Sequence, residues 1–207
     1  LLDWGLRLCC LLAAPAALGL AMLSFPLIAT MFMNKGFTLN DAVMTKNALI
    51  ACSFCVVGQI MIKVLAPAFY AQQNIKTPVK VAVFSLIVTQ LMNIAFIVPL
   101  KHVGLSLSIG LGACLNAALL LTLLQLKGLY QPDAGWRRFL TKLAIALAVM
   151  CFGLWAAQSF MPMQWTDIRG WQKALQLGWL VLLGITLYFT SLALLGFRPR
   201  DFKRSEV

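Results

Sequence analysis

Six long apolar stretches, separated by short polar connectors, dominate this sequence. They cover approximately residues 6–32, 43–69, 78–98, 104–126, 139–160 and 174–197. Each has about the 20 residues that a helix needs to cross the hydrocarbon core of a membrane. The connectors are rich in Asn, Gly, Pro and charged residues, which are typical of turns and helix ends. The pattern predicts an all-α polytopic membrane protein with six transmembrane helices.

Composition supports this class. Hydrophobic residues make up 61% of the 207 residues and charged residues 11%, whereas a soluble domain carries about 25% charged residues. The apolar stretches do not alternate with polar residues as the strands of a membrane barrel would. The longest connector, about residues 161–173, is too short for a soluble domain. The whole chain, residues 1–207, is therefore expected to be one transmembrane unit.

The net charge of +11 is explained by membrane topology. The basic residues form short clusters between apolar stretches, without the basic stripe or motif of a nucleic-acid-binding protein. Six spans place both termini on one side, and that side carries most of the 17 Lys and Arg residues: Arg7, Lys76, Lys80, Lys127, Arg137, Arg138, Lys142, Arg198, Arg200, Lys203 and Arg204. Cytoplasmic segments are enriched in basic residues. We therefore expect both termini in the cytoplasm.

No catalytic set is apparent. The six carboxylates are assigned to loops or tails, and no phosphate-binding loop of the P-loop type is present. The chain begins with Leu1, without an initiator Met or a signal peptide, as a fragment of a longer protein would. These features favour a transport or scaffolding role over an enzyme.

Lys63 is the basic residue that lies deepest inside an apolar stretch. Only Ser53, Gln59 and Lys63 interrupt the apolar run from residue 48 to 70. A charge at such a depth costs a few kcal/mol and marks either a snorkelling side chain or a pathway for ions or substrates. The sequence leaves both readings open.

Other polar or small residues within the spans predict helix packing. Thr89 and Asn93 lie one turn apart, and hydrogen bonding between helices is favoured over an ion site there. Two small-xxx-small pairs, formed by Ser106, Gly110, Ser108 and Gly112, predict close helix contacts. Pro15 and Pro26 are expected to kink the first span and to free backbone groups.

The last two spans are nearly free of polar side chains. The exceptions are Gln158 and Ser159 in one span and Thr186, Tyr188, Thr190 and Ser191 in the other. We expect these helices to contact lipid acyl chains rather than to line an aqueous path.

Several strings carry a family resemblance. They are LAPAFYA at 65–71, QQNIKTPVK at 72–80, QLMN at 90–93, PLKHVGLSLSIG at 99–110, CLNA at 114–117, and LGF at 195–197 with the basic tail. They resemble the MurJ (MviN) family of lipid II flippases, within the MOP exporter superfamily, and most closely its gammaproteobacterial members. The resemblance extends over essentially the whole chain.

The resemblance implies a fold of fourteen helices in two lobes around a central cavity, of which this chain would be the last six helices, part of the second lobe. It implies transport of lipid II, the undecaprenyl-pyrophosphate-linked peptidoglycan precursor, across the bacterial inner membrane by alternating access. Its partners would be the N-terminal portion of the same flippase, lipid II and membrane lipids; an inhibitory protein would be a partner if the chain served as a docking target. No cofactor is implied, and it stays open whether membrane potential, a cation gradient or neither drives the cycle.

The resemblance also suggests roles for individual residues. Lys63 corresponds to a cavity lysine and would contact the pyrophosphate as a point charge, beside arginines of the first lobe that this chain lacks. The last two helices resemble the pair that forms a hydrophobic groove for the polyprenyl tail. Some members bind sodium through an Asn and an Asp one turn apart; Thr89 and Asn93 occupy these positions here, so they are weaker metal candidates.

Two alternatives remain open from the sequence. One is another flippase of the same fold that transports a different lipid-linked oligosaccharide. The other is a membrane protein without transport activity that serves as a scaffold or docking partner for cell-wall enzymes.

Overall fold

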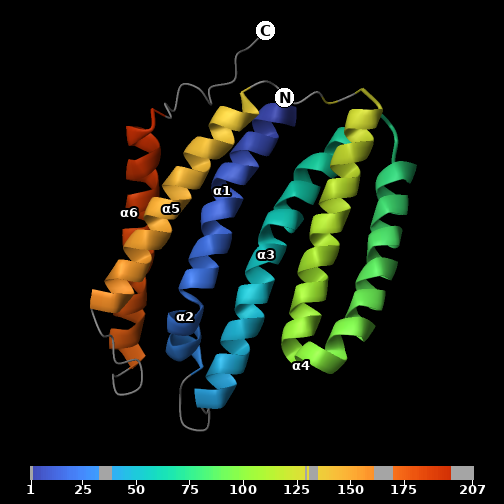
Figure 1. Cartoon of the computed structure of the whole chain (residues 1–207). Coiled ribbons are helices and arrows are strands. Elements are labelled where there is room, and N and C mark those ends of the chain that lie inside the picture. The colour runs from blue at the N-terminus through green and yellow to red at the C-terminus, as the bar shows by residue number, and fades with distance from the viewer. Residues whose placement is uncertain (1, 33–38, 129, 131–134, 161–169, 197–207) are drawn as a thin grey trace.

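The chain folds as a bundle of helices whose long axes run side by side (Figure 1). The computed structural model describes residues 2–32, 39–128, 130, 135–160 and 170–196. The elements are α1 (Leu2–Met22), α2 (Ser24–Met31), α3 (Leu39–Tyr70), α4 (Lys76–Leu126), α5 (Trp136–Phe160) and α6 (Gly170–Leu194). The start of α1 and the end of α6 lie at the same end of the bundle (Figure 1).

Six helical segments are long and apolar enough to cross a membrane. They are Leu2–Met22, Asn40–Tyr70, Lys76–Pro99, Val103–Leu126, Trp136–Phe160 and Trp171–Leu194. The described part of the chain contains no β-strand. The prediction of an all-α polytopic membrane protein with six spans is confirmed.

The third and fourth spans belong to one bent helix. The helix α4 is continuous over 51 residues, and Figure 1 shows it as two antiparallel arms that meet at a sharp bend. The first arm ends at Pro99 and the second begins at Val103. Proline lacks the N–H that would bond the carbonyl four residues earlier, and its ring clashes with that carbonyl, so a helix bends there. The sequence predicted a loop between these spans, whereas the connection is helical.

The first predicted span is divided into α1 and α2. The break lies at Leu23, three residues before Pro26, and it follows from the same loss of a backbone donor. Pro15 lies inside α1 without ending it. Each of these prolines leaves the carbonyl four residues earlier without its helical partner, namely Leu11 O and Met22 O.

Side chains from the last two helices bond to both freed carbonyls. The Tyr188 hydroxyl of α6 donates to Leu11 O at 2.6 Å, and Gln158 Nε2 of α5 donates to Met22 O at 3.4 Å. Buried backbone carbonyls need a partner where water is absent. The prolines of α1 and α2 therefore provide the acceptors that attach these helices to α5 and α6.

Replacing Tyr188 by Phe is expected to destabilise the chain by about 1–3 kcal/mol, because Leu11 O would be left buried and unbonded. The measurement is the thermal unfolding midpoint of the purified chain in detergent. Thr186→Val is the matched control, because the Thr186 hydroxyl is exposed and bonds only within its own helix, to Leu183 O. Equal midpoints for the two variants would contradict the role of the Tyr188 hydrogen bond.

The helix α1 contributes to both hydrophobic clusters of the bundle. In one cluster Leu11 of α1 packs with residues of α2, α5 and α6, including Leu154 and Leu180. In the other, Leu6 packs with residues of α3 and α4, including Phe69 and Leu120. The α1 helix therefore joins a unit made of α5 and α6 to a unit made of α3 and α4.

The contact between α3 and α4 depends on glycines. A Cβ atom at Gly58 would lie 2.7 Å from the backbone N of Cys114, and one at Gly110 would lie 3.5 Å from Ala51 O. A Cβ atom at Gly112 would overlap the side chain of Thr89, in the other arm of α4. Ser108 is fully buried. The close packing predicted for the small residues of the fourth span is confirmed at Gly110 and Gly112.

Gly58→Ala is expected to destabilise the chain by about 1–3 kcal/mol, because the new methyl group would meet backbone atoms of α4 that can move only with the whole helix. Gly178→Ala is the control, since a Cβ there has no atom within 4 Å and alanine favours a helix over glycine. Thermal unfolding in detergent measures both. A Gly58→Ala protein as stable as the Gly178→Ala protein would rule out this close contact.

Candidate functional site

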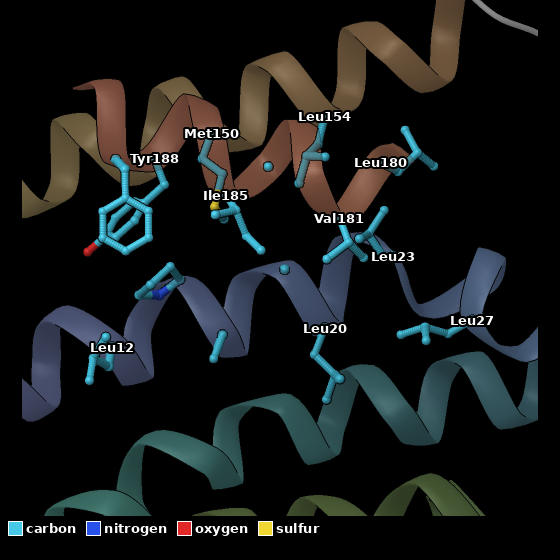
Figure 2. A pocket seen from close by; sticks show the side chains of 15 residues that line it. Leu12, Leu20, Leu23, Leu27, Met150, Leu154, Leu180, Val181, Ile185 and Tyr188 are labelled. Atoms are coloured by element: carbon cyan, nitrogen blue, oxygen red, sulfur yellow. The ribbon is translucent and has the colours of Figure 1, made fainter. Parts of the chain in front are cut away.

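An apolar groove of about 440 Å³ lies between α1, α2, α5 and α6. Figure 2 shows it with Leu12 and Tyr188 toward one end and Leu27 and Leu180 toward the other. Met150 and Leu154 of α5 form its floor between these ends. The sequence assigned such a groove to the last two helices by resemblance; α1 and α2 form a further wall.

Small residues leave this space open. Pro15, Ala16 and Gly19 line the groove from α1, and Gly184 lines it from α6. A Cβ atom at Gly19 would have no atom within 4 Å, whereas one at Gly184 would only touch Leu154 at 3.5 Å. The facing surfaces of α1 and α6 therefore lack the side chains that would otherwise fill the gap.

The lining of the groove offers almost no polar groups to water. Its residues are all uncharged, and its one side-chain hydroxyl, on Tyr188, is already bonded to Leu11 O. A cavity with such walls does not hold water, which needs two or more polar partners. Leu12, Ile185 and Phe189 at its border are about half exposed. The groove therefore suits a hydrocarbon chain that enters sideways from the lipid phase.

Lys63 lies outside this groove. It is exposed on α3, on the same helix face as Gln59 and Pro67, which are also exposed and lie one turn to either side. Within the described part of the chain its ammonium has no hydrogen bond or ion pair. The structure thus leaves Lys63 accessible, and its predicted contact with a pyrophosphate stays a prediction.

Thr89 and Asn93 lie in the first arm of α4, and their observed hydrogen bonds are local. The Thr89 hydroxyl donates to Ser85 O at 2.7 Å, and Asn93 Nδ2 donates to Gln90 Oε1 at 3.3 Å. The expected hydrogen bonds between helices are therefore corrected to bonds within one helix, because the close approach of Gly112 leaves Thr89 only a packing contact across the arms. Their role as metal candidates stays a prediction.

A polar cluster that sequence reasoning missed surrounds Asp3. Asp3 Oδ1 accepts hydrogen bonds from the Tyr130 hydroxyl at 2.8 Å and from Trp136 Nε1 at 2.5 Å. Its Oδ2 pairs with Arg7 Nε at 2.8 Å, and the Arg7 guanidinium lies 5.7 Å from the centre of the Trp136 ring. The cluster ties the first turns of α1 to the connection between α4 and α5.

The sequence contained only part of this signal. Asp3 was assigned to a tail, whereas it lies in the first turn of α1, where a carboxylate is favoured by the helix dipole. Its spacing of four residues from Arg7 is typical of a helical ion pair, but the contacts to Tyr130 and Trp136 span more than 120 residues. Burial, then the hydrogen bond and charge of Asp3, raise the pKa of Tyr130, so its hydroxyl stays a donor to higher pH than that of a free tyrosine.

Comparison with known proteins gives consistent matches. Residues 1–169 match the family described as "Lipid II flippase MurJ". A relative of that name from Burkholderia cenocepacia is 46% identical over 99% of this chain and 40% of its own length. A MurJ relative from Vibrio cholerae is 36% identical over 98% of the chain and 38% of its own length. The chain therefore spans about 40% of the length of these relatives.

A solved structure has the same fold. The chain superposes on "Lipid II flippase MurJ, inward closed conformation" with a TM-score of 0.75, over 98% of this chain and 39% of that one, at 21% sequence identity. This likeness identifies the fold alone. Because the family match covers far more than half of the sequence, the chain belongs to the MurJ family of lipid II flippases.

Proposed function

We propose that this chain is the C-terminal portion of a lipid II flippase that acts together with an N-terminal portion like that of its longer relatives. Lipid II would pass from the cytoplasmic to the periplasmic leaflet of the bacterial inner membrane by alternating access, without covalent change. Both termini would face the cytoplasm, in keeping with the distribution of basic residues. The observation that carries this proposal is the apolar groove between α1, α2, α5 and α6.

The groove would hold the polyprenyl tail while the polar headgroup crosses elsewhere. Lipid acyl chains are as apolar as the groove, so hydrophobicity alone does not favour the tail over them. Selection must come from shape and packing along the small residues Pro15, Gly19 and Gly184. When no substrate is bound, we expect an ordinary acyl chain to occupy the groove.

Lys63 would contact the lipid headgroup at a different surface of the bundle, on α3. It is exposed on α3, whereas the groove lies on the opposite side of α1. A lysine is a compact point charge that suits phosphate oxygens. The separation allows the charged headgroup and the apolar tail to follow different surfaces of the same helix bundle.

The proposal is tested by rescue of cells depleted of their own flippase. The chain is co-expressed with the N-terminal portion of its own protein or of the Burkholderia cenocepacia relative, and the two halves together are expected to restore growth. Lipid II in the periplasmic leaflet is measured with a reagent that does not cross the membrane. Failure of rescue with both halves present in the membrane would refute the proposal; rescue without a rise in accessible lipid II would point to a scaffold.

A further inference from the structure

The buried face of α6 extends beyond the groove toward the start of the helix, where it includes Lys173. Leu180, Gly184 and Tyr188 line the groove from α6 at a spacing of four residues, which places them on one helix face. Lys173 precedes Leu180 by seven residues, two turns on the same face, or about 10 Å along the axis. Lys173 is only 5% exposed. A lysine that snorkels to water keeps its ammonium exposed, so this burial calls for another explanation.

No described residue supplies a compensating anion for Lys173. Within residues 2–32, 39–128, 130, 135–160 and 170–196, its ammonium takes part in no hydrogen bond or ion pair. Gln176, one turn further along α6, has a buried Oε1 without a hydrogen-bond partner. Its amide can turn to present either the oxygen or the NH₂ group, because the two ends are nearly equivalent in shape.

The position of Lys173 adds to the positive potential. It lies in the first turn of α6, where the helix dipole places a partial positive charge and where backbone N–H groups have no partner within the helix. A cation is unfavourable at such a place unless an anion accompanies it. The ammonium, the first-turn N–H groups and the Gln176 amide together form a donor set that suits a phosphate.

We propose that Lys173 and Gln176 form a phosphate-binding end of the groove, which holds the phosphate of a polyprenyl lipid whose tail lies along α6. This inference rests on the proposed function. The start of α6 lies at the end of the bundle opposite the start of α1 (Figure 1), which is the periplasmic end in the proposed orientation. Lys63 would then contact the headgroup before transport, and Lys173 would contact it after transport.

The test uses the full-length protein in which this chain is the C-terminal portion, purified in detergent. Binding of undecaprenyl phosphate and of undecaprenol is compared by native mass spectrometry, with phosphatidylglycerol and inorganic phosphate as competitors. The Lys173→Gln variant is expected to reduce the preference for the phosphorylated lipid by about tenfold, the effect of losing a charge-assisted hydrogen bond. Lys173→Arg is expected to retain the preference, and Gln176→Leu to reduce it by a smaller factor.

Lys46→Gln is the matched control, because Lys46 is another lysine in the first turns of a helix that starts at the same end of the bundle, but is less buried. Its preference for the phosphorylated lipid should equal that of the wild type.

An unchanged preference in the Lys173→Gln protein would overturn the inference while leaving the groove intact. Equal displacement of the lipid by phosphatidylglycerol or by inorganic phosphate would overturn it too. Failure of both polyprenyl lipids to bind the wild type would instead refute the proposed function. Lys173→Arg separates loss of charge from loss of folding.

Discussion

Gly19→Leu is expected to abolish transport while the protein remains in the membrane at its normal level. Gly19 lines the groove, and a side chain there would extend into open space without touching any atom within 4 Å of its Cβ. Replacing glycine inside a helix also favours the helix by about 1 kcal/mol. The substitution therefore fills the groove without disturbing the fold, and it removes the space proposed for the tail of a polyprenyl lipid.

The measurement combines rescue of flippase-depleted cells with the amount of lipid II exposed in the periplasmic leaflet. Gly178→Leu is the matched control, because Gly178 is also inside a helix with open space around it but lies outside the groove. Normal transport in the Gly19→Leu protein would show that the groove is not used. Loss of transport in both variants would show that added bulk anywhere in these helices is harmful.

Asp3→Ala is expected to lower the stability of the chain by about 2–3 kcal/mol. The substitution removes the acceptor of Tyr130 and Trp136 and the partner of Arg7 in one step. Hydrogen bonds to a charged group contribute about 1.5–3 kcal/mol, and the ion pair adds a smaller share, because each side chain keeps about a quarter of its surface in solvent, which screens the charges. Asp3→Asn retains an acceptor oxygen and should cost less.

A double-mutant cycle with Tyr130→Phe isolates the hydrogen bond. Tyr130→Phe should destabilise the wild type, yet have little effect once Asp3 is replaced by Ala. Thermal unfolding of the four proteins in detergent gives the coupling energy. An equal effect of Tyr130→Phe in both backgrounds would contradict the observed contact.

The fold was predictable because the length of each apolar stretch in the sequence is enough to identify a membrane span. What hydropathy does not specify is the geometry at prolines: Pro99 bends one helix back on itself, whereas Pro15 leaves α1 unbroken. The freed carbonyl alone does not decide what a proline does, because Leu11 O and Met22 O are both bonded by other helices, yet α1 continues past Pro15 and ends before Pro26. Trp155 and Trp179 illustrate the same limit, since both lie inside apolar spans and are more than half exposed.

The site was predictable only in part for the same reason. The groove on the last two helices followed from family resemblance, but the wall formed by α1 and α2 depends on contacts between residues far apart in sequence. Tyr188 and Gln158 stood out only as polar interruptions in apolar helices. Their partners, Leu11 O and Met22 O, are backbone atoms, which no side-chain pattern in the sequence can reveal.

The bond between Tyr188 and Leu11 makes two distant sequence positions dependent on each other. Proline at position 15 creates the acceptor, and tyrosine at position 188 uses it. If position 15 held an ordinary residue, its own N–H would take the Leu11 carbonyl, and the Tyr188 hydroxyl would be released into an apolar groove at a cost of desolvation. Among relatives, proline at the first position and tyrosine at the second should therefore be gained and lost together during evolution.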